Sequence, residues 1–293
     1  MNLNKQQQKI FDSLNDKQKD VFIHNITHTP IYSILHGAVR SGKSFLDNIL
    51  WLCHVASFSG QNKDFIMSGY TIPALYKNVI KDLEEILGSR ITLDKNNSFE
   101  LFGNTMRCFG TNKIDSYKAA RGFTSYGHYG NEVNLSHKNS IDEFINRCSG
   151  EGARFFWDCN PDNPNHYIMT DYIEKSGETM ADGQMLYSEY HFTLTDNTRL
   201  PDSYVQSMLN MPEGMRKNRS VYGLWVASEG VIYTNYIPSQ HRIEKPKYDI
   251  VETWAGVDFG FEHNGVIVVV GRDYDGNVYL LHEVASQHKQ IEW

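Results

Sequence analysis

The chain has 293 residues, of which 40% are hydrophobic and 13% aromatic, enough apolar material for one to two folded domains. Its formal net charge of -7 excludes a protein coated with basic surface for nucleic acid, although it still allows a local basic stripe. No apolar run is long enough to cross a bilayer, and the polar first twenty residues lack the core of a signal peptide, so we expect a cytoplasmic protein with no membrane partner. The four cysteines are widely spaced, which predicts reduced thiols rather than a zinc site.

Helical and strand patterns alternate over the first 160 residues. In chain order they predict a polar amphipathic helix over 5–24, a strand over 31–35, a helix over 43–58, a strand over 64–68, a helix from Pro73 to about Leu87, a hairpin over 99–109, a strand over 126–133, a helix over 140–148 and a strand over 154–159. This alternation predicts an α/β fold with a mostly parallel central sheet flanked by helices.

A domain boundary is expected in residues 238–248, a polar stretch that contains two prolines. Segments 253–260 and 265–271 then begin a new strand-rich unit, and residues 273–277 are typical of a hairpin turn. We therefore expect one domain over residues 1–237 and a second, smaller unit over 248–293.

A phosphate-binding loop is the clearest motif. Residues 37–44, Gly-Ala-Val-Arg-Ser-Gly-Lys-Ser, match GxxxxGK[ST] at every fixed position and lie between a predicted strand and a predicted helix. The glycines let backbone N–H groups turn toward phosphate oxygens, and the helix adds the positive end of its dipole. Lys43 is expected to reach the β- and γ-phosphates and Ser44 to bind Mg²⁺. The predicted site for ATP and Mg²⁺ comprises Gly37, Arg40, Ser41, Gly42, Lys43 and Ser44.

An enzyme with such a loop also needs an acidic group on a neighbouring strand to orient the attacking water. Two places offer one, Asn131-Glu132 and Asp142-Glu143, and the second pair lies in a helical pattern that predicts a solvated face. We therefore expect Glu132 to be the catalytic base. Asn131 precedes it where an aspartate on the Mg²⁺ side is usual, and an amide can bind a metal-bound water but brings no charge.

With these residues in place, the chain resembles the large terminase subunit of tailed bacteriophages, the ATPase-nuclease that packages DNA. The likeness extends over essentially the whole length. The segments that carry it, in order, are the loop at 37–44 with Arg40, Ala120-Arg-Gly122 with Gly130-Asn-Glu-Val133, Phe156-Trp-Asp-Cys-Asn-Pro161 with Asn165-His-Tyr167, Asp196-Asn197, Gly223-Leu-Trp225, Glu229-Gly-Val-Ile-Tyr233, and Gly256-Val-Asp-Phe-Gly260 with 266–271.

The resemblance implies roles for three further residues of the ATPase part. Gln18 matches the position that recognises adenine, where an amide can both donate and accept, although a solvated Gln is the alternative. Arg121 matches an arginine that reaches a neighbouring subunit's nucleotide, with Arg147 and Arg40 as rivals and a surface ion pair as the alternative. Asn160 matches the residue that couples γ-phosphate sensing to motion, and a turn residue before proline is the alternative.

The last segment is similar to the first hairpin of the family's ribonuclease-H-like nuclease. Asp258 matches the first carboxylate that binds a divalent ion, Mg²⁺ or Mn²⁺, in that domain. Two-metal cleavage needs several converging carboxylates, and Glu283 either faces Asp258 or is an exposed edge acid. We expect this part of the nuclease to be incomplete and its activity doubtful.

The resemblance implies a packaging motor that acts in the host cytoplasm and transiently on the procapsid. Its implied partners are double-stranded DNA, a portal protein, a small terminase subunit and further copies of the chain in a ring on the portal. Two other functions remain open at this point. One is a different P-loop helicase or nucleic-acid ATPase, and the other is a nucleotide-binding fragment that does not hydrolyse ATP, which Asn131 favours.

Overall fold

The computed structural model describes residues 5–113, 115–227, 241, 243, 245–260 and 265–286. It divides the chain into two compact units, residues 1–231 and 232–293, and each is described by itself. The predicted limits at 237 and 248, and the assignment of the parts to an ATPase and a nuclease, stay predictions. The segment 229–233, singled out in the sequence, lies outside the described residues. No helix in the described part of the chain is long and apolar enough to span a bilayer.

A seven-stranded sheet forms the centre of unit 1, in the order β3-β4-β2-β5-β6-β1-β7. Only the β3–β4 pair is antiparallel. The strands are β1 (Tyr32–Gly37), β2 (Asp64–Gly69), β3 (Ser98–Leu101), β4 (Asn104–Gly110), β5 (Ser125–Gly130), β6 (Arg154–Cys159) and β7 (Tyr187–Phe192). The predicted α/β class with a mostly parallel central sheet is therefore confirmed.

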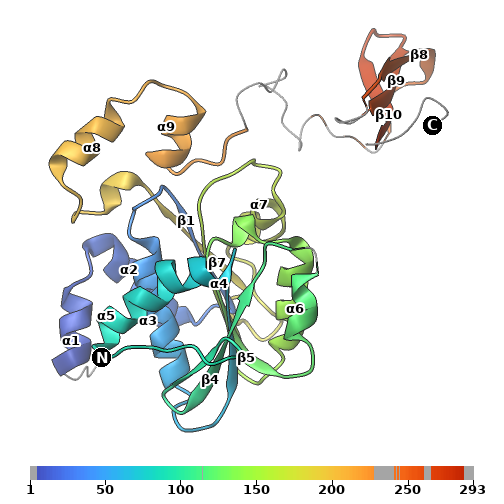
Figure 1. Cartoon of the computed structure of the whole chain (residues 1–293). Coiled ribbons are helices and arrows are strands. Elements are labelled where there is room, and N and C mark those ends of the chain that lie inside the picture. Colours follow the sequence, from blue (N-terminus) through green and yellow to red (C-terminus); the bar gives the residue numbers. More distant parts are fainter. Residues whose placement is uncertain are drawn as a thin grey trace. The chain divides into compact units, whose positions relative to one another are not determined.

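Helices cover both faces of this sheet (Figure 1). The regular helices of unit 1 are α1 (Lys5–Asp12), α2 (Asp16–His28), α3 (Lys43–Ala56), α4 (Ile72–Leu75), α5 (Lys81–Leu87), α6 (Lys138–Arg147), α7 (Tyr167–Asp171), α8 (Asp202–Leu209) and α9 (Met215–Ser220). A π-helical turn (Tyr76–Ile80) joins α4 to α5, and short 3₁₀ turns lie at Ser116–Ala120, Val133–Leu135, Ile173–Lys175 and Leu194–Asp196.

Successive strand residues point to opposite faces of the sheet, so each strand contributes to two cores. Leu35 packs in a core with Leu46 and Trp51 of α3. Ile34 packs on the other face, in a core that includes Phe144 of α6. Because both faces are buried, β2 and β6 contain short apolar runs, Phe-Ile-Met and Phe-Phe-Trp, which the sequence predicts well.

Three expectations about the elements need correction or addition. The helix predicted over 5–24 is two helices, because Asn15 caps α2 and forms a reciprocal capping box with Gln18. The helix predicted from Pro73 is present but contains the π-turn. Strand β7, Tyr-Ser-Glu-Tyr-His-Phe, is not among the predicted elements, and it pairs with β1 at the edge of the sheet.

Unit 2 is an antiparallel meander of β8 (Ile250–Asp258), β9 (Gly265–Asp273) and β10 (Val278–Ser286), with β9 in the middle. The predicted turn at 273–277 is present, since Asp273 accepts hydrogen bonds from the backbone and side chain of Asn277. Several apolar side chains of this sheet are exposed, among them Trp254 and Leu280.

Two buried histidines, His54 and His128, should make the stability of unit 1 decrease in acid. Burial lowers the pKa of His54 from 6.5 to about 4, although its Nε2 hydrogen-bonds the Tyr126 carbonyl. Burial also lowers the pKa of His128 to about 3. Between pH 6.5 and about 4 the unfolded chain therefore binds more protons than the folded chain, and stability falls as the pH falls.

We expect His54→Gln, which can keep the bond to Tyr126, to reduce this loss by up to about 1.4 kcal/mol per pH unit. The measurement is the free energy of unfolding in urea between pH 7 and pH 5. The exposed His28→Gln serves as the control. Equal pH slopes for His54→Gln and the parent would contradict this account.

Candidate nucleotide-binding site

The loop from β1 to α3 has the backbone that its sequence predicts. Gly37 and Gly42 lie at φ +132° and +91°, and Arg40 also has a positive φ of 59°. A Cβ at Gly37 would lie 1.9 Å from the Phe192 carbonyl oxygen, so no other residue fits there. Asn197 donates from Nδ2 to the Arg40 carbonyl over 2.7 Å, which ties the predicted Asp196-Asn197 segment to the loop.

Lys43 is buried inside this loop, with 5% of its surface exposed. Its ammonium donates to the carbonyls of Gly37 (3.0 Å) and Ala38 (2.6 Å), and contacts Ser41 Oγ at 3.3 Å and Asn160 Oδ1 at 3.2 Å. Burial lowers the Lys43 pKa, and the nearby charge of Asp158 opposes that shift most strongly. The ammonium is thus held by neutral oxygens that a phosphate could replace.

The strand order places two further groups opposite the loop. Because β6 lies between β1 and β5, the residues that follow β5 and β6 meet at the carboxyl edge of the sheet. Asn160, just after β6, accepts from Lys43 and donates from Nδ2 to Glu132 Oε1 over 3.2 Å. Lys43, Asn160 and Glu132, predicted as the phosphate-binding lysine, the coupling residue and the base, therefore form one connected chain of contacts.

Glu132 is placed for proton chemistry by its backbone and its surroundings. It lies at φ 50°, in the left-handed region, two residues after the end of β5. Burial raises the pKa of its carboxyl, the charge of Asp158 raises it further, and Lys43 opposes both. A carboxylate whose pKa is raised is a better proton acceptor for water.

Asp158 is a site residue that the sequence analysis did not single out. It is the fifth residue of β6 and is 2% exposed. Its carboxylate accepts from Asn131 Nδ2 at 3.0 and 3.2 Å and from the Glu132 backbone N–H at 2.7 Å. The signal in the sequence was an acid at the end of an apolar strand, Phe-Phe-Trp-Asp.

Gln18 lies in the first turn of α2 and contacts the phosphate loop. Its Oε1 accepts from the Asn15 backbone N–H at 3.1 Å, and its Nε2 donates to the Gly42 carbonyl at 2.9 Å. The Nε2 end of the amide therefore holds α2 against the phosphate loop, while the Oε1 end completes the capping box of α2. Recognition of adenine by Gln18 stays a prediction.

The predicted arginines lie apart from the phosphate loop, with one exception. Arg121 is exposed, and its Nε lies 3.8 Å from Glu143 Oε2, while Arg147 Nε lies 3.1 Å from Oε1 of the same carboxylate. The expectation that Asp142-Glu143 lies on a solvated face is wrong for Glu143, whose side chain is 12% exposed because these two arginines cover it. Arg40 belongs to the loop itself and lies over the Tyr204 ring.

Asp258 is the last residue of β8 and is exposed. Within the described residues, no three His, Cys, Asp or Glu side chains gather as a metal site. The Glu283 side chain lies on β10, which is separated from β8 by β9. A metal role for Asp258 stays a prediction.

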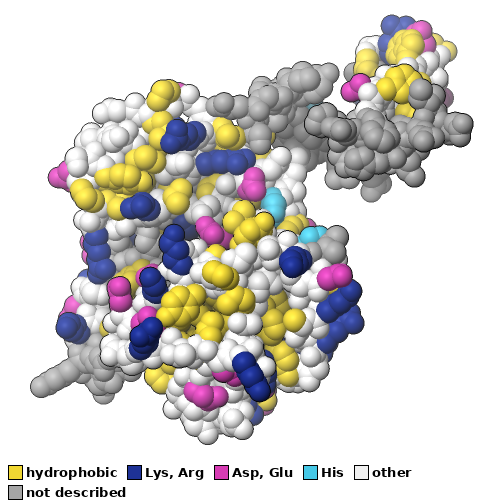
Figure 2. All heavy atoms as spheres, viewed as in Figure 1, with side chains coloured by type: hydrophobic (Ala, Val, Ile, Leu, Met, Phe, Trp, Pro, Cys, Tyr) yellow, Lys and Arg dark blue, Asp and Glu magenta, His cyan; other side chains and the backbone are white. Residues whose placement is uncertain are grey.

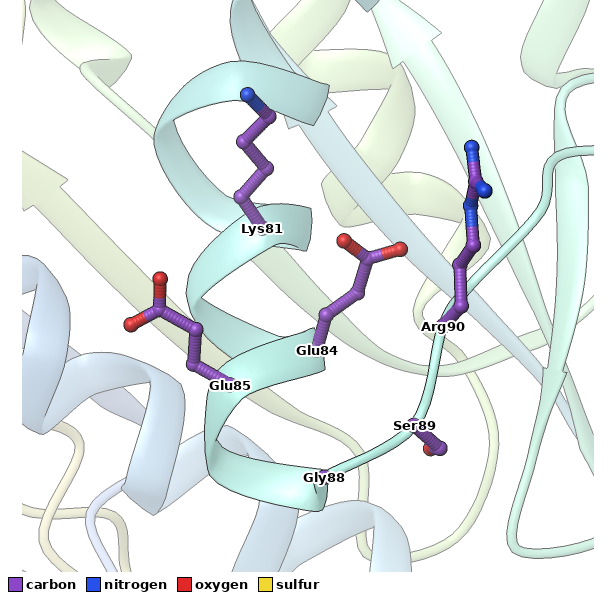
Figure 3. A pocket seen from close by; sticks show the side chains of 6 residues that line it. All are labelled: Lys81, Glu84, Glu85, Gly88, Ser89 and Arg90. Carbon is purple, nitrogen blue, oxygen red and sulfur yellow. The ribbon is translucent and has the colours of Figure 1, made fainter.

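Other surface features do not coincide with the predicted site. A hollow of about 410 Å³ at the end of α5 is lined by Lys81, Glu84, Glu85, Gly88, Ser89 and Arg90 (Figure 3). Its Glu84 carboxylate already accepts from the Ile91 backbone N–H and the Tyr76 hydroxyl. On the visible face of unit 1, Lys and Arg side chains are scattered among apolar and acidic ones (Figure 2).

Comparison with solved structures places this fold among phage large terminases. The large terminase of a thermophilic bacteriophage, in complex with ADP, is 25% identical, with a TM-score of 0.63 over 94% of this chain and 71% of that one. The HK97 bacteriophage large terminase has a TM-score of 0.54 at 13% identity, over 93% of this chain and 63% of that one. The large terminase ATPase domain of Thermus phage P74-26 has a TM-score of 0.54 at 11% identity, over 77% of this chain and all of that one.

The resemblance to large terminases that the sequence predicted is therefore confirmed, and this chain has their fold. No protein-family model and no curated protein sequence matches the chain.

The segment that resembles a terminase linker, Gly223-Leu-Trp225, packs against the phosphate loop. A Cβ at Gly223 would lie 2.5 Å from the Phe192 carbonyl oxygen and 2.7 Å from the Ala38 nitrogen. Trp225 donates from Nε1 to His36 Nδ1 over 3.2 Å, directly before Gly37. The loop is thus supported by a further segment besides α2 and Asn197.

We expect Gly223→Ala to weaken ATPγS binding by about tenfold, because the added methyl group must displace the loop. Gly88→Ala is a matched control. Gly88 has φ +68° against +69° for Gly223, but a Cβ there would meet no described heavy atom within 4 Å. Both variants bear the cost of a positive φ, about 1–3 kcal/mol, so only Gly223→Ala should affect binding. Equal ATPγS affinities in the two variants would argue against support of the loop by Gly223.

Proposed function

We propose that this chain is the ATP-hydrolysing motor subunit that drives packaging of viral double-stranded DNA into procapsids. The observation that carries the proposal is the chain of contacts from Lys43 through Asn160 to Glu132 at the carboxyl edge of the sheet. Asn160 thus contacts both the lysine of the phosphate loop and Glu132, the proposed base, which follows a different strand. The fold it shares with large terminases supports the choice of motor.

In the proposed reaction, the triphosphate lies in the loop and Lys43 moves from the carbonyls of Gly37 and Ala38 to the phosphate oxygens. Glu132, whose pKa is raised by burial, accepts a proton from the attacking water. Asn160 would lose or change its bond to Lys43 when the γ-phosphate is present, and so report the nucleotide's state to Glu132.

The residues present fit a bound Mg²⁺. Ser44 follows Lys43 at the start of α3 and offers a hydroxyl, and across the site lie the Asn131 amide and the buried Asp158 carboxylate, all oxygen ligands of the kind Mg²⁺ prefers. When bound, the ion would neutralise charge on the phosphates.

The motor function would bring several partners. We propose double-stranded DNA, a portal protein, a small terminase subunit and further copies of this chain in a ring, acting in the host cytoplasm and at the procapsid. A helicase or another nucleic-acid ATPase remains the second candidate, and only the packaging motor should bind a portal. We expect no nuclease activity from the described part of unit 2, because the exposed Asp258 lacks converging carboxylates among the described residues.

The central test is a steady-state ATPase assay of the base. Glu132→Gln should keep nucleotide affinity but lose turnover by about 100-fold or more, because an amide cannot accept the proton. Glu143→Gln, which removes a shielded carboxylate paired with arginines, should have little effect. Lys43→Ala should lose most activity while staying folded. ATP hydrolysis at the parental rate in Lys43→Ala, or a larger loss of turnover in Glu143→Gln than in Glu132→Gln, would contradict the assignment of these residues to the ATPase site.

The proposed role of Arg121 in a neighbouring subunit's site can be tested by mixing variants. Arg121→Ala and Glu132→Gln should each be inactive, and their mixture should regain activity, because some interfaces then hold an intact arginine and an intact base. Arg147→Ala mixed with Glu132→Gln is the comparison, since Arg147 shares the Glu143 carboxylate. If the Arg121→Ala mixture stays inactive although the variants co-assemble, Arg121 does not act between subunits.

A further inference from the structure

At position 131 this chain differs from the sequence pattern of the terminase family that it resembles. Asn131 directly follows β5, at the place where an aspartate on the metal side is usual. Mg²⁺ in nucleotide sites is commonly held by one or two carboxylates together with the phosphates. A neutral amide cannot bring that charge, so either the metal is held without it or another carboxylate supplies it.

Asp158 lies beside Asn131 on the neighbouring strand. In the β5–β6 register Gly130 is opposite Trp157, which puts the next residues, Asn131 and Asp158, at the same level. On its other side Asp158 is opposite Leu35 of β1, the strand that leads into the phosphate loop. Asp158 therefore lies between the loop and the strand end where the aspartate is usual.

The Asp158 carboxylate is fixed by neutral donors, although its charge also acts on the nearby Lys43 ammonium. The Asn131 amide nitrogen is within hydrogen-bond distance of both its oxygens, and the Glu132 N–H adds a third contact. Among the described residues, no Lys, Arg or His nitrogen forms an ion pair with it. A buried carboxylate without an ion pair is costly, so this position is suited to a further cation.

Asp47 is a second buried acid, in the first turns of the helix that follows the phosphate loop. It lies three residues after Ser44 and four after Lys43, on the same face of α3. Its side chain is fully buried, and neither carboxyl oxygen has a hydrogen-bond partner among the described residues. Burial raises the pKa of Asp47 well above its usual range, and the charge of Asp158 raises it further.

We propose that Asp158 supplies, on the metal side of the nucleotide, the negative charge that residue 131 lacks. Asn131 is then a positioning residue, which holds the Asp158 carboxylate toward the phosphate loop. The inference rests on the proposed ATPase function, because it concerns the metal of the same site. The competing view is that Asp158 only anchors Asn131 and the Glu132 backbone.

The test measures ADP affinity with and without Mn²⁺ and follows bound Mn²⁺ by electron paramagnetic resonance. In the parent, Mn²⁺ should tighten ADP binding, and Asp158→Asn should lose about tenfold or more of that tightening without weakening ADP binding in EDTA. The double exchange Asn131→Asp with Asp158→Asn should restore it, because the carboxylate–amide pair re-forms with its members swapped between strands. Asp162→Asn, an acid just beyond Asn160 that pairs with Arg219, is the control.

Full Mn²⁺-dependent tightening in Asp158→Asn, or a double exchange no better than Asp158→Asn alone, would overturn the inference. Should Asp158→Asn fail to fold, the Asn131→Asp variant provides the test. Residues 131 and 158 would then both be carboxylates, so Mn²⁺ should raise the Tm of this variant more than that of the parent. An equal rise in Tm would overturn the inference. A parent that binds no ADP at all would instead defeat the proposed function, so the two failures are distinguishable.

Discussion

The burial of the Lys43 ammonium is the constraint on which the rest of the site depends. A buried cation needs acceptors, and this one finds them in the backbone carbonyls of Gly37 and Ala38, in Ser41 and in Asn160. Those carbonyls face inward only because the loop adopts positive φ at Gly37 and Gly42. The conformation of the loop and the position of Asn160, the proposed coupling residue, therefore both help to satisfy one buried charge.

The same charge also connects elements that are far apart in the sequence. Asn160 passes the contact on to Glu132 after β5, and Asp158 holds the Glu132 backbone. On the outer side, Gln18, Asn197 and Gly223 each contact the loop from a different segment. The loop is thus contacted by segments from widely separated parts of the sequence.

Much of this could be predicted from the sequence, because the signals are local. The phosphate loop follows from residue types at fixed spacing, and β2 and β6 follow from their short apolar runs. The break before α2 also has a local signal, since Asn15 and Gln18 have the spacing of a capping box, but the apolar spacing across 5–24 favours one continuous helix. Strand β7 escapes prediction because its polar and aromatic residues at a sheet edge lack an apolar run.

Asp158 and Glu143 could not be placed from the sequence alone. Asp158 faces the loop only because β6 is inserted between β5 and β1, an order fixed by pairing between distant segments. The helical pattern around Glu143 predicts a solvated acid, but Arg121 and Arg147 shield it. Whether a polar residue is buried depends on partners that helical periodicity does not reveal.

The contact between Asn160 and its two neighbours is the centre of this account, and Asn160→Ala tests it most directly. ATPγS affinity and phosphate release should be measured on the same preparation. Affinity should stay within a few-fold of the parent and turnover should fall by about 100-fold, because Glu132 would lose its connection to the phosphate loop. Turnover at the parental rate in Asn160→Ala, with nucleotide bound as tightly, would contradict it.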